Sequence, residues 1–445
     1  MIKIFIRACR PIRLTFVAFF LLASGIVQAQ NNFHNTHILD PYNPEYVPGE
    51  VLIKFKDEVM VKPKVESKRG NVTVKTGIKS IDEFIQDKQA LDIKKVFKET
   101  RESQAESRDR YITDFKGQRH EVPKLYNIYK LKFDEKQDAK ELSQLLAQDP
   151  TVEYAEPNYL VYTMEVIEKG KVPENPPQPT PIPNPTSPPS RDTYPNDPLY
   201  QDGSQWYLDT INAPATWDTV TGDTSQIIGI IDTGVDWDHP DLDDNIWTNW
   251  NEIPDNGIDD DGNGYADDTR GWDFVNDDND PNDDNSHGTH VAGIAAAEGN
   301  NGIGICGVNW NARIMPVKML QSSGTGNSSD LASAIEYASD NGATVINMSL
   351  GSYGESLTVK TALENAYAGT GSGGGALLVA AAGNDGRFLI QEGMPSGNMF
   401  PACYSFVIGV QATNSSGQLA FFSNIDPSGP VEFWNQWGHN YEIKA

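Results

Sequence analysis

The sequence predicts an α/β protein in which a parallel sheet has helices on both faces, preceded by a small α+β domain. From about residue 227 the 445-residue chain alternates short, continuously apolar runs with helical patterns, and this alternation is typical of a buried parallel sheet. A proline-rich stretch separates that region from a first region of mixed strands and helices. The length accommodates two to four domains.

The first 29 residues have the pattern of a secretory signal peptide. An apolar run covers 14–23, and small Ala29 precedes Gln30; the basic residues ahead of the run are Lys3, Arg7, Arg10 and Arg13. We therefore expect cleavage before Gln30 and a secreted, extracellular protein with no membrane contact after signal removal. A retained membrane anchor is the alternative, but the run is short for a bilayer span.

Residues 30–165 are predicted to form the α+β domain. Strands are expected at 51–55 and 126–131, a helix at 139–147, and a last extended piece over 152–162. A linker is assigned to 166–195. The stretch 171–200 holds 11 of the 28 prolines, so we expect a stiff, solvated spacer there.

Residues 196–445 are predicted to form the parallel-sheet domain. Expected strands lie at 227–231, 314–320, 344–349, 376–382 and 406–410, and expected helices run from near 287 to 298, over 330–339 and over 357–367. In such folds, ligands bind outside the carboxyl ends of the strands. Candidate functional residues are therefore sought at those ends.

Composition excludes several classes of protein. The chain has 35 basic and 62 acidic residues and a formal charge of -27, and residues 195–445 alone have 6 basic and 35 acidic ones. A nucleic-acid partner is therefore not expected. The chain has three cysteines, too few for a disulfide scaffold or a cysteine-rich zinc module. No pairing is assigned to Cys306 and Cys403.

Three short motifs lie at predicted strand ends or at a helix start. They are Asp232-Thr233-Gly234, His287-Gly288-Thr289-His290, and Gly383-Asn384 after an apolar strand. An acid that orients a histidine, a histidine that acts as general base, and an amide that donates to an oxyanion together indicate acyl transfer. Asp232, His287 and Asn384 are the candidates for these three roles.

In these motifs the region from about 196 to 445 resembles the subtilisin-like serine proteases, or subtilases. The resemblance implies that Asp232 and His287 belong to the catalytic triad and that Asn384 is the oxyanion donor. It also implies that Ser349, Leu350 and Gly351 bind an extended peptide substrate by backbone pairing. Protein or peptide substrates are the partners that follow from this resemblance.

The first domain resembles fervidolysin-like subtilase prodomains, in the segments 46–55 and 152–159. That resemblance implies an intramolecular inhibitor and folding chaperone whose tail lies along the substrate cleft. A processing point is expected between Thr163 and Tyr194, without a more exact position.

The family's nucleophile motif, G-T-S-x-A, is absent from the 445 residues, and so is G-x-S-x-G. We therefore interpret 196–445 as an incomplete peptidase domain that ends before its serine, and expect the fragment itself to be inactive. A non-catalytic pseudo-protease that binds peptides is the alternative. An aspartic protease needs a second D-T-G, which the sequence lacks.

An acidic insertion lies between Asp232 and His287. From Asp241 to Asp284 it holds 16 acidic residues and one basic residue. Alternating oxygen ligands in its centre favour a structural Ca²⁺ site, with these expected ligands: Asp259, Asp261, Asn263, the carbonyl of Tyr265, and Asp267. A solvated, self-repelling acidic loop is the alternative. A metal site at His287 and His290 is disfavoured because H-E-x-x-H is absent.

Overall fold

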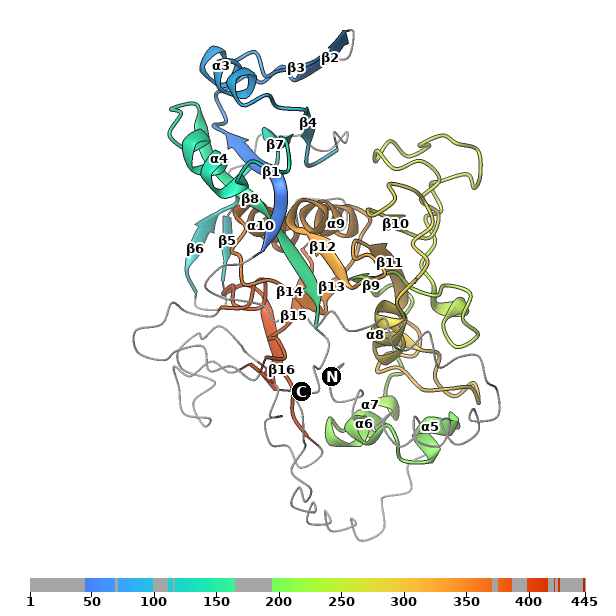
Figure 1. Ribbon diagram of the computed structural model, residues 1–445. Helices are drawn as coiled ribbons and strands as arrows, with labels where there is room; N and C mark the ends of the chain where they lie inside the picture. Colours follow the sequence, from blue (N-terminus) through green and yellow to red (C-terminus); the bar gives the residue numbers. More distant parts are fainter. Residues whose placement is uncertain are drawn as a thin grey trace, which may run out of the picture.

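The structure is a computed structural model that describes residues 45–68, 71–98, 111–114, 117–164, 194–369, 375–385, 398–414, 420, 423–424 and 443–444. The predicted signal peptide and nearly all of the predicted linker lie outside the described residues. Figure 1 shows a small domain above a larger one, with strand β8 running from the first into the second. None of the helices in the described part is long and apolar enough to cross a membrane.

The small domain is an antiparallel sheet packed against helices. Its strand order is β8-β1-β7-β4, with β1 (Tyr46–Phe55), β4 (Asp92–Lys95), β7 (Ile128–Lys132) and β8 (Val152–Thr163). Helix α4 (Ala139–Leu146) begins at Asp138, whose side chain accepts hydrogen bonds from the amides of Lys140 and Glu141. The strands and the helix that the sequence predicts here agree with these elements.

The remaining elements of the small domain are short. They are helix α3 (Lys79–Asp87), the hairpin of β2 (Lys64–Lys68) with β3 (Asn71–Lys75), and the hairpin of β5 (Tyr111–Thr113) with β6 (Arg119–Glu121). Ile81 and Ile85 of α3 are buried in the same core as Val51, Ile53 and Phe55 of β1. The small domain thus has a hydrophobic core of its own.

The larger domain is built on a parallel sheet, as predicted. The strand order is β10-β11-β9-β13-β15-β16-β17, with β9 (Ile227–Asp232), β10 (Trp272–Asp273), β11 (Arg313–Lys318), β13 (Val345–Met348), β15 (Leu377–Ala381), β16 (Ile408–Gln411) and β17 (Ile443–Lys444). Every pairing in it is parallel. All strands therefore direct their carboxyl ends to one edge.

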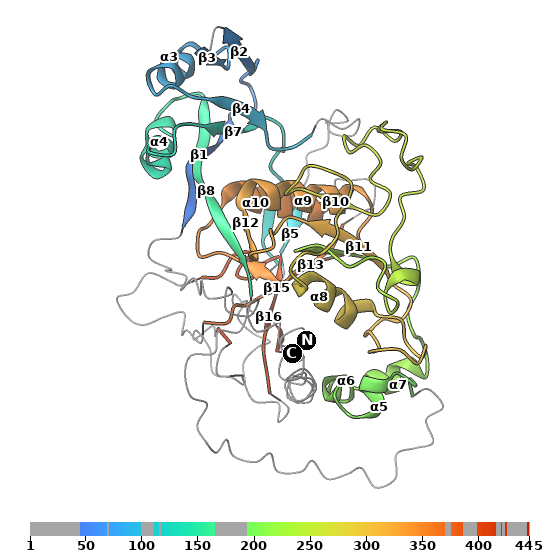
Figure 2. The same ribbon diagram turned by 45° about the vertical axis from the view of Figure 1, so that its right-hand side comes forward.

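Helices cover the two faces of this sheet unequally. Alternate residues of a strand point to opposite faces, and Ile231 packs in the cluster of α9 (Ser328–Asp340) and α10 (Leu357–Ala368), whereas Ile230 packs in that of α8 (His287–Ala296). Helices α9 and α10 lie side by side in both views (Figures 1 and 2). Three short helices precede β9: α5 (Pro198–Gln201), α6 (Trp206–Thr210) and α7 (Ala213–Trp217).

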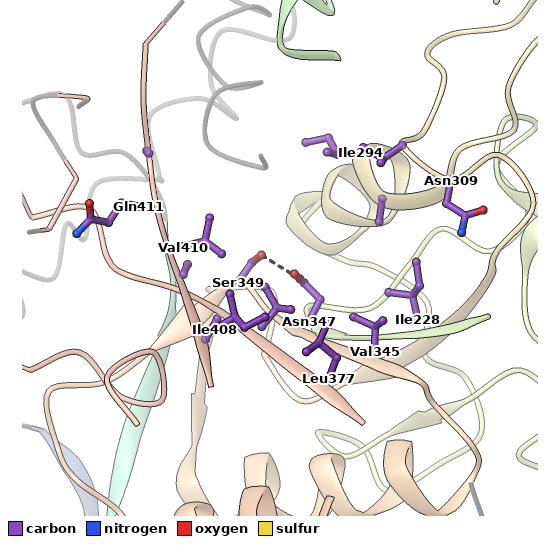
Figure 3. Close-up of a pocket in the computed structure, with 16 residues that line it drawn as sticks. Ile228, Ile294, Asn309, Val345, Asn347, Ser349, Leu377, Ile408, Val410 and Gln411 are labelled. Carbon is purple, nitrogen blue, oxygen red and sulfur yellow. Dashed lines mark hydrogen bonds between the residues drawn. The ribbon is translucent and has the colours of Figure 1, made fainter. Parts of the chain in front are cut away.

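An apolar hollow of about 370 Å³ lies on the α8 side of the sheet (Figure 3). It is lined by Ile294 of α8 and by side chains of four strands, among them Ile228, Val345, Val379 and Val410. Within the described residues, α8 therefore covers only part of this face.

Strand β8 joins the two domains by backbone pairing. It continues past the small domain and lies between β12 (Thr325–Asn327) and β14 (Leu350–Gly351), antiparallel to both. Figure 2 shows β8 descending from the small domain onto the edge of the larger one. The two domains of the described chain are thus joined by hydrogen bonds between β8 and strands of the larger domain.

Candidate active site

Asp232 and His287 meet at the carboxyl edge of the parallel sheet. Asp232 is the last residue of β9 and is fully buried, and His287 is the first residue of α8. The Nδ1 atom of His287 lies 2.7 Å from Oδ1 of Asp232. That oxygen also accepts a hydrogen bond of 2.8 Å from the amide of Thr233. The second oxygen of Asp232 is buried with no hydrogen-bond partner among the described residues.

Glycines permit this close approach. A Cβ atom on Gly288 would lie 2.0 Å from the carbonyl oxygen of Gly234 and 3.1 Å from Cβ of Asp232. Gly234 itself has a positive φ of 102°, and a Cβ there would meet the carbonyl of Pro281 at 2.6 Å. The helix can therefore begin against the strand end only because both positions lack a side chain.

A further carboxylate, Asp283, connects the two motifs. Its Oδ1 accepts hydrogen bonds from the hydroxyl of Thr233 and the amide of Ser286, and its Oδ2 accepts from the amide and hydroxyl of Thr289. The Thr233 hydroxyl oxygen in turn accepts from the amide of Gly288. This network fixes the start of α8, and hence the imidazole, relative to the end of β9.

Lys318 lies on the neighbouring strand, opposite Asp232 in register. Its buried ammonium donates to the carbonyl of Thr233 at 2.7 Å and to the carboxylate of Asp284 at 2.6 Å. The turn that follows Asp232 is therefore held on two sides, by Asp283 and by Lys318.

Asn384 follows β15, two strands further along the same edge. Gly383 before it has φ +105°, and a Cβ there would lie 2.2 Å from Nδ2 of Asn424. The Asn424 side chain donates to the carbonyl of Ala382 and accepts from the amide of Asp385. Asn424 therefore holds the turn that presents the Asn384 carboxamide.

A strand of the small domain occupies the cleft between these groups. Leu350 pairs with Thr163 and Gly351 with Tyr162. The amide of Met164 donates to the carbonyl of Ser349 at 3.1 Å. The buried carboxamide of Asn384 donates to the carbonyl oxygen of Met164 at 2.8 Å. The predicted peptide-binding segment 349–351 thus pairs with an extended strand.

The acidic insertion folds into a compact loop. Oxygen atoms of Glu252, Asp259 and Asp261 lie within 4.8 Å of one another, which makes these three side chains a candidate metal group in the described part of the chain. Glu252 is buried and accepts from the amides of Asp260 and Asp261. Asp259 and Asp261, both predicted ligands, therefore come together, with Glu252 as a third carboxylate that the sequence analysis missed.

The other three predicted ligands, Asn263, the carbonyl of Tyr265, and Asp267, belong to the same loop, and their side chains make the following contacts. Asn263 is adjacent, with its side-chain amide donating to Asp268 at 3.0 Å. The carboxylate of Asp267 accepts from the amides of Asn256 and Gly257. The ring of Tyr265 is buried beside Trp272 and Tyr337, under the ammonium of Lys98, which lies 3.8 Å from its centroid.

Sequence reasoning also missed four residues that shape the site: Asp283, Lys318, Asn424 and Met164. Asp283 lies close to the His287 motif in the sequence, and Lys318 pairs with Asp232 in the sheet. Only this closeness to a motif could have indicated them. Asn424 and Met164 are distant in sequence from the groups that they contact, and nothing in the local pattern indicates those contacts.

The fold and the arrangement of Asp232 and His287 resemble those of a serine protease of the α/β class, with a small domain whose last strand pairs with the larger one. The chain matches the subtilase family over residues 223–445 and the fervidolysin N-terminal prodomain over residues 96–158. The chain therefore belongs to the subtilase family, as the motifs predicted.

Individual relatives agree with this assignment. The chain is 33% identical to the thermophilic serine proteinase of Bacillus sp. (strain AK1), over 85% of this chain and 67% of that protein. It is 37% identical to the extracellular protease of Xanthomonas campestris pv. campestris, over 51% of this chain and 41% of that protein.

A solved structure supports the fold. The crystal structure of fervidolysin from Fervidobacterium pennivorans, described as a keratinolytic enzyme related to subtilisin, is similar with a TM-score of 0.50 and 22% identity. The similarity covers 83% of this chain and 44% of fervidolysin. The chain thus spans between about two fifths and two thirds of the length of these three relatives.

Proposed function

We propose that the chain is the zymogen of a secreted serine endopeptidase that hydrolyses peptide bonds with an aspartate–histidine–serine triad. The observation that carries this proposal is the 2.7 Å contact between Asp232 and His287, beside a cleft in which Asn384 donates to a peptide carbonyl. The matched relatives that are named as proteinases favour the same chemistry.

Each group has a distinct chemical role in this proposal. Asp232 holds the proton of His287 on Nδ1, which leaves Nε2 free of a proton and able to accept one from a serine hydroxyl. Asn384 stabilises the oxyanion that forms on the attacked carbonyl. The serine would come from a part of the protein outside these 445 residues, since no G-T-S-x-A motif is among them.

The apolar hollow is consistent with a further element on the α8 side. Parallel sheets are normally covered on both faces, and in the described residues the side chains of β13, β15 and β16 on this side line a hollow instead. Ile294 of α8, the helix that begins with His287, borders the same hollow. An amphipathic helix packed here would extend the covered face of the sheet that carries Asp232 and Asn384.

The small domain is proposed to act as an intramolecular inhibitor. Its strand β8 occupies the cleft between β12 and β14, so a peptide substrate would have to displace it. Residues 1–29 are proposed to direct secretion, a proposal supported by the extracellular relative. N-terminal sequencing of the 445-residue chain, secreted by a bacterial host and expected to stay uncut without the serine, should give Gln30 as the first residue.

We further propose that the acidic loop binds Ca²⁺ through Glu252, Asp259 and Asp261. Three carboxylates with oxygens within 4.8 Å fit a hard cation that prefers oxygen ligands. The ion would stabilise the loop and take no part in the reaction. Because a ligand at 100 times its Kd adds about 2.7 kcal/mol, EDTA should lower the Tm by about 5–10 °C.

Two substitutions separate specific binding from a general effect of charge. Asp261→Asn should abolish the response to EDTA, and Asp255→Asn, in an exposed position of the same loop, should preserve it. A wild-type Tm that is the same with EDTA and with calcium would contradict the calcium proposal.

The enzymatic proposal is tested on the secreted product of the whole gene. We expect it to hydrolyse casein, and expect His287→Ala to lower kcat by about 10⁶-fold and Asn384→Ala by about 10²–10³-fold. A folded product that binds extended peptides but hydrolyses none would favour the pseudo-protease instead. Sequencing the codons that follow Ala445 for a G-T-S-x-A motif decides independently between the two functions.

A further inference from the structure

The end of β8 is held in one register by contacts on both sides. Thr325 pairs with Tyr162 on one side, and Gly351 pairs with Tyr162 on the other. The amide of Thr163 donates to the carbonyl of Gly324 at 2.8 Å. The strand therefore lies in the cleft as the middle strand of three, and its next residue along is Met164.

Met164 is bound differently from the residues before it. Its amide donates to the carbonyl of Ser349, and its carbonyl oxygen accepts from Asn384 at 2.8 Å, where a peptide carbonyl under attack would be stabilised. The residue is 3% exposed.

The side chains of the tail also fit the cleft. Cε of Met164 lies 2.7 Å from the point that a Cβ on Gly351 would occupy, so the methionine side chain packs directly against this glycine. Val161, three residues earlier, is 1% exposed and lines a small hollow with Leu331 and Val359. An unbranched apolar residue and a β-branched apolar residue are thus buried at these two positions.

We infer that the peptide bond between Met164 and Glu165 is the first substrate of this site and the point at which the prodomain is released. The inference rests on the proposed protease function and deepens it by naming the bond. It narrows the range expected from the sequence, Thr163 to Tyr194, to one position.

Cleavage of this bond uses the groups already proposed for catalysis. The serine oxygen bonds to the carbonyl carbon of Met164 while its proton passes to Nε2 of His287, and the oxyanion is held by Asn384. The carbon–nitrogen bond to Glu165 then breaks, and the same proton passes to the departing amine. Water hydrolyses the resulting ester, which leaves a carboxylate on Met164.

The register is tested first, on the 445-residue chain, by a method that needs no activity. Paired residues of antiparallel strands lie about 4.5–5.5 Å apart at Cα, within the reach of a disulfide, and diagonal neighbours lie about 7–8 Å apart, beyond it. The variant Tyr162→Cys with Thr325→Cys should cross-link on mild oxidation. The matched variant Leu160→Cys with Thr325→Cys should not.

The native thiols should not complicate this test on the secreted chain, because Cys9 lies in the predicted signal peptide and the other two are buried. Cys306 and Cys403 are buried, and burial raises the pKa of both thiols, so little thiolate is present for exchange. Peptide mapping by mass spectrometry identifies the linked pair. A cross-link in the control pair instead of the test pair would mean a shifted register and would overturn the inference.

Cleavage is tested on the secreted product of the whole gene. We expect the mature enzyme to begin at Glu165 and the released prodomain to end at Met164, and expect His287→Ala to leave the precursor uncut. Met164→Asp should slow processing at least 100-fold, because a charge would enter a buried position. Met164→Leu should be processed normally, and so should Met60→Asp, the same change at a methionine that is 75% exposed.

The outcomes distinguish this inference from the proposed function. An active enzyme that begins at a residue other than Glu165 would overturn the inference and leave the protease function standing. A folded product that is neither cleaved nor active would overturn both, and the cross-link would still show whether the tail lies in the cleft.

Discussion

At the scale of residues, the Asp232–His287 contact depends on a buried carboxylate with few competing partners. Oδ1 of Asp232 is hydrogen-bonded to Nδ1 of His287 and to the amide of Thr233. Oδ2 is buried with no hydrogen-bond partner in the described part of the chain. Burying a charged group with an unsatisfied oxygen is costly. In the proposed mechanism, the carboxylate of Asp232 therefore serves to hold the imidazole in one orientation.

Asp232→Asn is predicted to abolish catalysis and spare the fold. An asparagine amide would donate to Nδ1, move the ring proton to Nε2, and leave that nitrogen unable to accept a proton from serine. The kcat of the whole gene product should fall about 10⁴-fold, measured with a chromogenic peptide. Asp238→Asn, at an exposed position of the following loop, is the control and should retain full activity. Equal activity of the two variants would contradict the role of Asp232.

At the scale of elements, the site depends on how closely α8 approaches β9. Gly288 and Gly234 bring the helix start onto the strand end, and Asp283 ties the two together through Thr233, Ser286 and Thr289. The motifs read from the sequence as a catalytic acid and base are thus also packing motifs. The small residues in them are as necessary to the geometry as the charged ones.

Gly288→Ala is predicted to destabilise the larger domain, and Gly293→Ala in the same helix is the control. A Cβ at 288 would meet backbone at 2.0 Å, whereas a Cβ at 293 would meet only the flexible Cδ1 of Ile305 at 3.2 Å. The first change should cost about 2–4 kcal/mol, and the second should be neutral or stabilising by up to about 1 kcal/mol. Thermal unfolding measures both, and a Gly288→Ala variant as stable as its control would refute the packing argument.

The elements also show which parts of the fold and the site could be predicted from the sequence, and why other parts could not. Strands such as β9 are short, continuous apolar runs, and helices such as α9 have apolar residues at helical spacing, so both could be predicted. Asp232, His287 and Asn384 lie in motifs of a few adjacent residues. Glu252 could not be selected among 16 acids, because the loop's own turns bring it to Asp259. Helices α5 to α7 have five residues or fewer, too short for a periodic pattern.

At the scale of the whole molecule, β8 belongs to both domains. Its first half pairs with β1 in the small domain and its second half with β12 and β14 in the larger one. Side chains of the same strand bind the starts of two helices: Asn158 accepts from the amide of Ser329 in α9, and Glu156 accepts from the amides of Leu357 and Thr358 in α10. Polar groups removed from water thus contribute to the contact between the domains, together with the backbone pairing of β8 and a shared apolar cluster.

Glu156 should make this contact dependent on pH. Burial raises the pKa of its carboxyl, and the bonds from Leu357, Thr358 and Ser356 oppose this effect without outweighing it. A carboxyl whose pKa is higher in the folded protein than in the unfolded chain contributes most below its unfolded value, and that contribution is lost as pH rises through the folded pKa. The contact should therefore weaken as the pH rises above about 4.3, the usual pKa of a glutamate in an unfolded chain.

The measurement compares Glu156→Gln, which cannot titrate, with the parent chain across this pH range. The free energy of unfolding of the parent should fall relative to that of Glu156→Gln as the pH rises. Glu153→Gln makes the same change at a 44% exposed side chain of the same strand and is the control. If the parent instead gained stability over Glu156→Gln as pH rose, the helix amides would outweigh burial, and the contact between prodomain and protease domain would strengthen with rising pH.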